Sequence, residues 1–411
     1  MSAVILKARR LIDGTGGAVV EHPAVVVVDG KVTDVFEGAI PDGAAPAGAE
    51  VLAYPEATLL PGLIDAHVHL NLPGDGSDFT AWVQEPDGVL VAASLHNARV
   101  ALKAGITALR DCGGRGDTTF QVRRALDLGL GAGARLVLCG QPITITGGHC
   151  RYFGGEADGV EGVRQKAREM AKLGADYIKV MGTGGGTPGT MSWLPSFRRE
   201  EIRALADEAH RLGRKIGIHC LCAESIDYAV DAGVDQIEHA GFLVDAAGKQ
   251  QFDPLVAIQL AHSGAVVCPT MAVGLYVINK MEAKERRTAA EQALLDRWRT
   301  MLEENLAQFR GLREAGVRFV AGTDAGWRFT PFDSLPDELM LMHQGGLSAM
   351  ETIISATSAA AKALGLEAKV GTIRTGMEAD IIAVTGDPLA ELGALKRVAM
   401  VMKAGEVNPW I

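Results

Sequence analysis

The chain has few cysteines, few aromatic residues and no excess of basic charge, and each shortage narrows its possible functions. It has 411 residues but only 6 cysteines, and the one close pair, Cys220 and Cys222, has the spacing of neither a zinc knuckle nor a thioredoxin motif. We therefore expect free buried thiols in a reducing compartment. Lys and Arg number 40 against 50 Asp and Glu, so the formal net charge is −10, with no basic stripe. This balance argues against nucleic acid or an anionic membrane as a partner.

The sequence also lacks long apolar segments. Residues 1–10 carry only a few apolar side chains before Lys7, Arg9 and Arg10, a pattern that does not fit a secretory signal. No apolar run reaches the length of a transmembrane helix. We therefore expect a soluble, cytoplasmic protein with no membrane partner. We also expect it to act on a small-molecule substrate and to assemble as a homo-oligomer.

Glycine is abundant, with 50 residues, and its positions predict a repeated unit. Six helix-like stretches each end in a glycine that suits the left-handed residue closing a helix, and a short apolar strand follows within a few residues. These glycines are Gly105, Gly174, Gly213, Gly233, Gly264 and Gly316. The expected strands are 59–64, 106–109, 135–139, 177–180, 216–218, 236–237, 265–268 and 317–321. Eight such units predict an α/β fold, a (β/α)8 TIM barrel over residues 58–367.

The two ends of the chain differ from the middle because they are rich in strands and lack helical periodicity. Strands are expected at 4–6, 24–28 and 32–36 near the start, and at 380–384 and 398–403 near the end. Since both β segments flank the barrel, we expect residues 1–57 and 368–411 to fold together as one small β-sandwich domain.

Polar side chains with metal-binding chemistry follow the expected strands. His67 and His69 are one residue apart, so on an extended backbone they point to the same side. A lone buried histidine is more often an ordinary core residue, but several such groups meet at the C-terminal mouth of one barrel, where function resides. The predicted metal ligands are His67, His69, Lys179, His219, His239 and Asp324.

Lys179 needs a separate explanation because an ammonium group has no lone pair with which to bind a metal. If its amine reacts with CO₂, the resulting carbamate has two acceptor oxygens that can bridge two cations. The histidine pair of the first strand and Asp324 would then hold one ion, and His219 with His239 would hold the other. Two ions held roughly 3.5–4 Å apart can polarise a carbonyl and lower the pKa of a shared water. We expect two divalent ions, with zinc fitting this ligand set best.

These residues resemble the amidohydrolase superfamily over essentially the whole chain. The matching stretches are 61–69 with its two histidines, 177–180 with Lys179, His219, 237–240 with His239, 322–326 with Asp324, and the tail at 376–381 and 386–389. The resemblance implies the binuclear subtype with a carboxylated lysine, usually loaded with zinc. Glycine-rich stretches at 146–149 and 182–189 are similar to the imidazolonepropionase-related, prolidase-like branch. That branch includes Xaa-Pro and Xaa-Arg dipeptidases and carboxypeptidases, ochratoxin-type amidases and phenylurea hydrolases.

Large side chains gather in the loops after the expected strands, although the chain has only 5 Trp, 5 Tyr and 11 Phe. They favour a pocket for an aromatic or bulky apolar group, and the alternative is that they plug loops or bury a subunit contact. Two arginines on the same rim could grip a carboxylate. The predicted substrate-binding residues are Arg151, Tyr152, Phe153, Trp193, Trp327 and Arg328. His149 is a candidate to polarise the scissile carbonyl or to hold a substrate carboxylate.

The sequence therefore predicts a binuclear metal-dependent amidohydrolase. A metal-bridging hydroxide would attack the carbonyl carbon of an amide, peptide-like, urea or carbamate C–N bond, and Asp324 would move the proton to the leaving amine. Other possibilities are an Xaa-Pro or Xaa-Arg dipeptidase or carboxypeptidase, or a deaminase or cyclic amidase that uses the same centre. A relative that kept the fold and lost catalysis is a further alternative, disfavoured by the intact ligand set.

Overall fold

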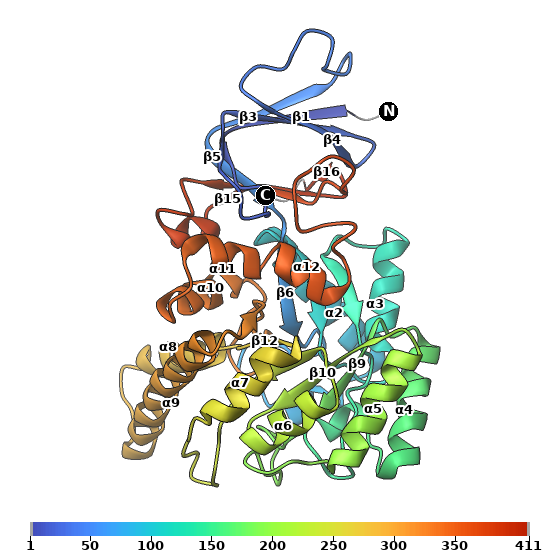
Figure 1. Ribbon diagram of the computed structural model, residues 1–411, viewed down its shortest axis with the longest axis vertical. Helices are drawn as coiled ribbons and strands as arrows, with labels where there is room; N and C mark the ends of the chain where they lie inside the picture. Colours follow the sequence, from blue (N-terminus) through green and yellow to red (C-terminus); the bar gives the residue numbers. More distant parts are fainter. Residues whose placement is uncertain (1–2, 409–411) are drawn as a thin grey trace.

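Eight parallel strands, β6 to β13, form the lower body of the computed structural model, which describes residues 3–408 (Figure 1). Their bounds are β6 Leu63–Val68, β7 Ile106–Asp111, β8 Arg135–Leu138, β9 Tyr177–Met181, β10 Lys215–Cys220, β11 Gln236–His239, β12 Val266–Cys268 and β13 Arg318–Phe319. Strands β6 to β8 pair in sequence order, and so do β9 to β13. Apart from the first, the predicted strands are confirmed within a few residues.

Backbone hydrogen bonds close these two sets of strands into one ring. The Asp176 N–H donates to the Leu138 carbonyl at 2.7 Å and joins the β8 side to the β9 side. The Ala66 N–H donates to the Ala321 carbonyl at 2.9 Å, and the Asp324 N–H donates to the His67 carbonyl at 2.8 Å. The last two bonds join the chain beyond β13 to β6. The predicted (β/α)8 barrel is therefore confirmed.

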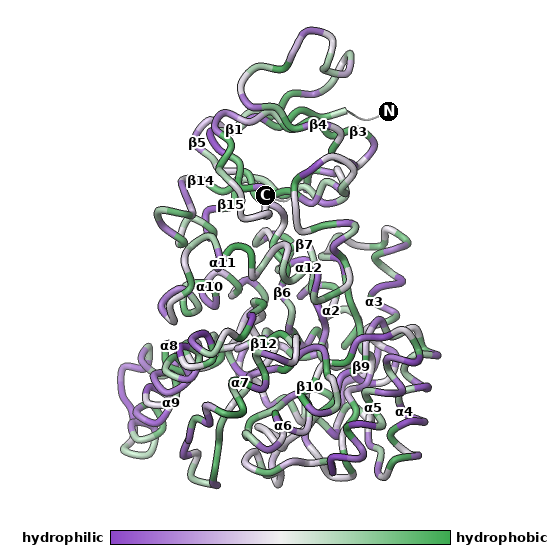
Figure 2. Tube along the Cα trace, viewed as in Figure 1, coloured by the Kyte–Doolittle hydropathy of each residue, from purple (hydrophilic) through white to green (hydrophobic). Residues whose placement is uncertain are grey.

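Helices connect the strands and cover the outside of the barrel (Figure 1). They are α1 Phe79–Trp82, α2 Asp87–Lys103, α3 Thr118–Asp127, α4 Gly159–Leu173, α5 Arg199–Arg211, α6 Ala223–Asp231, α7 Pro254–Ser263, α8 Ala272–Glu282, α9 Ala289–Glu314, α10 Leu335–Gln344, α11 Ala349–Ser355 and α12 Ser358–Leu364, with short 3-10 turns η1 Arg151–Phe153 and η2 Leu392–Lys396. In Figure 2, hydrophilic and hydrophobic residues alternate along outer helices such as α4 and α5, as expected when one helix face packs on a barrel. The six predicted helix-closing glycines have positive φ angles, from 66° to 96°. Among residues 3–408, no helix combines the length and apolar character needed to cross a membrane.

The two ends of the chain build one sheet above the barrel (Figure 1). Its strands are β1 Ala3–Leu11, β2 Val20–Glu21, β3 Pro23–Val28, β4 Lys31–Glu37, β5 Glu50–Pro61, β14 Ile381–Thr385, β15 Val398–Lys403 and β16 Glu406–Val407. The order is β16-β15-β14-β5-β1-β3-β4, with β2 beside β1, so strands from both termini share a ladder. Leu6, Val25, Leu59, Ile381 and Met402 belong to one buried cluster inside it. This sandwich-like unit of N- and C-terminal strands agrees with the prediction.

The bounds predicted for the first barrel strand, 59–64, are wrong. Leu59 to Pro61 form the end of β5, which pairs with β14 in the small sheet, and the barrel strand β6 begins at Leu63. One apolar run thus contributes residues to two sheets. The hydrophobicity of these residues does not show where β5 ends and β6 begins. The change occurs at Gly62, beyond the boundary of residue 57 expected for the small domain.

Gly62 has no room for a side chain at this crossing. A Cβ atom there would lie 2.2 Å from Thr107 Oγ1 and 2.3 Å from Thr107 Cγ2, and Thr107 is fully buried. We predict that Gly62→Ala lowers the unfolding free energy by about 1–3 kcal/mol through overpacking. Differential scanning calorimetry at one scan rate should show a lower Tm. Gly88→Ala is the matched control, since no heavy atom lies within 4 Å of its Cβ position. Equal Tm values for the two variants would contradict the prediction.

Candidate metal centre

The six predicted ligands converge at the C-terminal ends of the barrel strands. His67 is in β6 and His69 follows it, Lys179 is in β9, His219 is in β10, and His239 ends β11. Asp324 follows β13. All six line one cavity of about 210 Å³, and His149, from the loop after β8, lines it too. The volume suits a small molecule.

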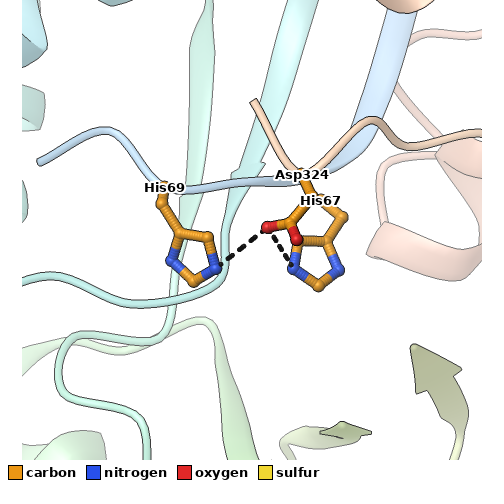
Figure 3. Close-up of side chains that lie close together, drawn as sticks. All are labelled: His67, His69 and Asp324. Atoms are coloured by element: carbon orange, nitrogen blue, oxygen red, sulfur yellow. Dashed lines mark ion pairs between the residues drawn. The ribbon is translucent and has the colours of Figure 1, made fainter. Parts of the chain in front are cut away.

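Asp324 lies between the two histidines of the first strand (Figure 3). Its Oδ1 atom is 3.4 Å from His67 Nε2 and 3.3 Å from His69 Nε2. One ligand atom from each of the three residues lies within 4.8 Å of the other two, and all three residues are buried. Two imidazoles and a carboxylate at this spacing are a suitable set for a divalent transition-metal ion.

The other two histidines adjoin this group. The ring centroids of His219 and His239 are 4.5 Å apart, and those of His67 and His239 are 5.1 Å apart. The Lys179 side chain points into the same cavity from β9. The structure therefore brings together the ligands predicted for both ions.

Hydrogen bonds on the outer ring nitrogens decide which nitrogen each histidine presents to the cavity. His67 Nδ1 lies 3.0 Å from Glu238 Oε2, and His69 Nδ1 lies 3.4 Å from the Gly113 carbonyl oxygen. These oxygens only accept, so Nδ1 carries a proton in both rings and Nε2 is the nitrogen that faces the cavity. His219 is reversed, because its Nε2 donates to the Gly184 carbonyl at 3.0 Å. The Thr270 hydroxyl occupies His239 Nδ1 at 2.6 Å. Such partners orient metal-binding imidazoles.

A buried chain of charges behind His67 was missed by the sequence analysis. Glu238 is 0% exposed and contacts His67 through Oε2, while its Oε1 accepts from Arg110 Nη2 at 2.6 Å. Burial acts to raise the pKa of Glu238, but Lys179 and Arg110 outweigh it and hold that pKa well below its usual value. Arg110 also donates to the Ala66 carbonyl and to Gln236. These buried charges could have been predicted from two strands that were expected to be buried and yet contain a charged residue, Arg110 in β7 and Glu238 in β11.

Several backbone positions around the site lie in the left-handed region. φ is 67° at His239 and 60° at Asp324, an unfavourable conformation for residues other than glycine. The turn before Asp324 is held by Asp65, which accepts from the Thr323 hydroxyl at 2.6 Å and from the His67 N–H at 3.0 Å. Asp65 thus ties the end of β6 to the segment that carries Asp324 and fixes the direction of both ligands.

Burial sets the protonation of the ligand groups. It lowers the pKa of His239 to about 3, with the charge of His67 adding to the effect, and it lowers the pKa of His219 well below its usual value. Both rings are therefore neutral at pH 7, as metal binding requires. Burial works in the opposite direction on Asp324, but His67 and His69 hold its pKa well below the usual range. Asp324 is therefore ionised.

Two buried polar atoms in the cavity have no hydrogen-bond partner among residues 3–408. They are Lys179 Nζ and Asp324 Oδ1. Lys179 is 1% exposed, and the carboxylate nearest to its Nζ is Glu238 Oε1 at 3.5 Å. Leaving such groups unsatisfied is costly. A cation beside Asp324 Oδ1, and a carbamate in place of the Lys179 ammonium, would satisfy both, so the residues fit a metal centre of the predicted type.

A second buried group of possible ligands, His67, Glu238 and Cys268, fits a metal less well. Both oxygens of Glu238 are engaged, one by His67 and the other by Arg110. Burial raises the pKa of the Cys268 thiol above its usual value, which keeps it protonated. Glu238 is therefore better explained as the partner that orients His67.

His149 adjoins the ligand group beside His219. Its ring centroid is 4.7 Å from that of His219, and its Nδ1 lies 2.7 Å from Thr187 Oγ1. Burial and then the neighbouring His219 lower its pKa well below the usual value. His149 is thus a neutral imidazole that faces the cavity, held by a loop hydroxyl.

The six predicted substrate-binding residues occupy different positions. Trp327 lines the cavity, whereas the fully buried Phe153 stacks behind His69 with ring centroids 6.1 Å apart. Tyr152 packs on Phe79, and Arg151 donates to the Pro188 carbonyl at 3.2 Å. The Arg328 guanidinium lies 5.4 Å from the Trp298 ring centroid and 5.8 Å from that of Trp327, and Trp193 does not line the cavity. Their roles in substrate binding remain predictions.

The contribution of α9 to the cavity was also not predicted from the sequence. This 26-residue helix lines the cavity with side chains spaced mostly three or four residues apart, which places them on one helix face. They are Trp298, Met301, Asn305, Gln308, Phe309 and Leu312. The spacing of these residues is visible in the sequence, but an amphipathic helix on a barrel has the same spacing.

Comparison with known proteins gives the family. The model of the amidohydrolase family matches residues 58–407. The chain is 28% identical to ochratoxinase from Aspergillus niger over 396 residues, which cover 86% of this chain and 77% of that protein. It is 26% identical to imidazolonepropionase from Rhizorhabdus wittichii over 412 residues, 90% and 89% of the two chains. A crystal structure of an Xaa-Pro dipeptidase with bound methionine is 28% identical, with a TM-score of 0.84 over 99% of this chain and 100% of that one.

The chain belongs to the amidohydrolase family. The resemblance inferred from the ligand motifs and their order is thereby confirmed. With amide- and peptide-cleaving relatives of this similarity, the protein is a hydrolase that acts on carbon–nitrogen bonds.

We predict that Glu238→Gln weakens zinc binding by roughly ten- to a hundredfold. A neutral amide holds the His67 Nδ1–H less strongly and leaves Arg110 without its counter-charge. Affinity is measured by competition with a chromophoric chelator. Glu208→Gln is the control, because Glu208 is also a buried carboxylate bound by arginines, but it lies on α5 away from the cavity. Equal zinc affinities for the two variants would exclude this role of Glu238.

Glu338 predicts a pH dependence of stability. Its Oε2 accepts from the Ala272 N–H at 2.6 Å, while its Oε1 is buried without a partner among the described residues, and burial raises its pKa to about 8. Between about pH 4.5 and pH 8 the folded protein keeps a proton that the unfolded chain has released. The unfolding free energy therefore falls as pH rises through this window, by up to about 1.4 kcal/mol per pH unit. Glu338→Gln should remove this component of the Tm-against-pH curve, and an unchanged slope would contradict the prediction.

Proposed function

We propose that this hydrolase is a binuclear metal-dependent enzyme that cleaves an amide, peptide-like, urea or carbamate bond in a small molecule with an aromatic or bulky apolar group. One observation carries the proposal. Four histidines, an ionised aspartate and a buried lysine whose Nζ has no hydrogen-bond partner among residues 3–408 line a single small cavity. An ordinary barrel core has no use for this combination, whereas two cations and a lysine carbamate account for every member of it.

The residues divide into two ligand groups. His67, His69 and Asp324 would hold one ion, and His219 with His239 the other, with Lys179 as a carbamate between them. Zinc is the ion we expect, because imidazole and carboxylate ligands suit it. Bound there, two such ions would activate water and polarise the carbonyl of the substrate.

The side chains of this protein have distinct tasks in the proposed reaction. Asp324 is ionised and lines the cavity, so it can accept the proton of the attacking water and return it to the leaving nitrogen. His149 is neutral and faces the same space, where it can donate a hydrogen bond to a carbonyl or a carboxylate of the substrate. Glu238 holds the His67 ring in position, and Asp65 holds the segment that carries Asp324.

The relatives support this range of substrates. An ochratoxinase, an Xaa-Pro dipeptidase and an imidazolonepropionase are each between 26% and 28% identical to the chain. A dipeptidase acting on Xaa-Pro or Xaa-Arg substrates, a carboxypeptidase and a deaminase or cyclic amidase are therefore the alternatives within the same chemistry.

A metal titration tests the proposal. Metal-free protein is prepared with a chelator, and zinc is then added stepwise in bicarbonate buffer. At each step, hydrolysis of aryl amides, N-acyl amino acids, dipeptides and ureas is measured. We predict that at least one class is hydrolysed and that the rate rises until two zinc ions are bound per chain, as counted by elemental analysis. A plateau at one ion, activity that survives chelation, or no turnover of any class with two ions bound would each contradict the proposal.

A further inference from the structure

The cavity extends from the predicted ligands to the inner face of α9, and the two regions differ in chemistry. Trp298, Met301 and Phe309 contribute apolar surface on the α9 side, joined by Leu243 from the loop after β11. Among the described residues that line the cavity, the formally charged ones are Lys179 and Asp324, both at the metal centre. Because no formally charged residue among those described lines the α9 side, an uncharged group is favoured there over a charged one, which would lose hydration.

Three side-chain amides form a connected chain on the α9 side. Gln250, from the loop before α7, donates from Nε2 to Asn305 Oδ1 at 3.0 Å, and Gln308 donates from Nε2 to Gln250 Oε1. Asn305 and Gln308 are three residues apart on α9 and therefore lie on one helix face. All three residues line the cavity.

One polar atom at each end of this series of amides makes no hydrogen bond to the described residues. Asn305 Nδ2 and Gln308 Oε1 have no hydrogen-bond partner among residues 3–408, and neither is among the fully buried unpaired atoms, so solvent reaches both. One end is a donor and the other an acceptor. Reversing all three amides exchanges the two ends but keeps one donor and one acceptor. These three amides therefore leave one donor and one acceptor for a ligand group that itself carries one of each.

We propose that the α9 side of the cavity binds the non-reacting half of the substrate. That half is a flat apolar body, such as an aryl ring, which ends in an uncharged group with adjacent acceptor and donor, such as a primary carboxamide or a lactam. Asn305 and Gln308 are the specificity-determining residues. This inference rests on the proposed function, because it takes the ligand cavity as the substrate site.

The chemistry of the three amides distinguishes closely matched ligands. A carboxylate has the shape of a carboxamide but only acceptor atoms. It therefore cannot donate a hydrogen bond to the Gln308 side-chain oxygen. An isopropyl group has a similar size but leaves both amide ends unpaired once water is displaced. Sites built to hydrogen-bond a substrate group discriminate strongly against analogues that lack it.

The test uses aryl amides whose para position carries a carboxamide, an isopropyl group or a carboxylate, made both as anilides and as benzamides. Hydrolysis by the zinc-loaded wild type gives kcat/KM, and calorimetric titration into the Asp324→Asn variant gives binding without turnover. In whichever series binds, we expect the carboxamide to bind at least roughly tenfold more tightly than both analogues. Asn305→Leu should abolish this preference while leaving binding of the isopropyl compound within about threefold.

Two further variants complete the test. Gln308→Leu should remove the preference in the same way, which covers the case in which Asn305→Leu fails to fold. Gln292→Leu changes an amide on the same helix that does not line the cavity, and it should keep the preference. Tighter binding of the carboxylate, or equal losses for all three compounds in the Asn305 and Gln308 variants, would overturn the inference. Selective binding without hydrolysis by the wild type would instead contradict the proposed reaction and leave the assignment of these residues intact.

Discussion

The contact between Arg110, Glu238 and His67 inside the barrel is the interaction on which the site depends most. Arg110 on β7 reaches the Ala66 carbonyl on β6 and both Gln236 and Glu238 on β11, so one guanidinium ties three strands together. Burying these charges is costly, and only a full set of hydrogen bonds offsets the cost. Because the bonds must be complete, the Glu238 carboxylate has little freedom, and His67 is held with Nε2 directed at Asp324. The orientation of the first ligand is therefore set from inside the barrel.

The cavity at the C-terminal mouth of the barrel combines two kinds of surface. The strand ends supply histidines, an ionised aspartate and a lysine, all within the residues that match the amidohydrolase family model. The α9 side supplies apolar side chains and a chain of amides from a helix and a loop that lie outside the strands. In the proposed reaction, chemistry and substrate choice thus come from different parts of the fold, as is usual for barrels whose loops vary around a fixed set of strand ends.

The amino-acid sequence was sufficient for the barrel, the composite sheet and the meeting of the six predicted ligands. The helix-closing glycines mark each unit, and side chains at the ends of parallel strands must meet at one mouth. It was insufficient at Gly62, where a single apolar run crosses from β5 to β6, because hydrophobicity does not record a change of sheet. It also failed to find Glu238 and Asn305, whose partners Arg110 and Gln250 are far away in the chain. Phe153 was predicted to bind the substrate because it is an aromatic residue in a loop after a strand, yet its ring stacks on His69.

Crystallography of the zinc-loaded protein tests the central claim most directly. Anomalous scattering at the zinc edge counts and places the ions, and the electron density at Lys179 shows whether the side chain ends at Nζ. We predict two ions, one beside His67, His69 and Asp324 and the other beside His219 and His239, with density continuing beyond Nζ as a planar carbamate that contacts both. A single fully occupied ion at the Asp324 group, together with density that ends at Nζ, would contradict the binuclear centre.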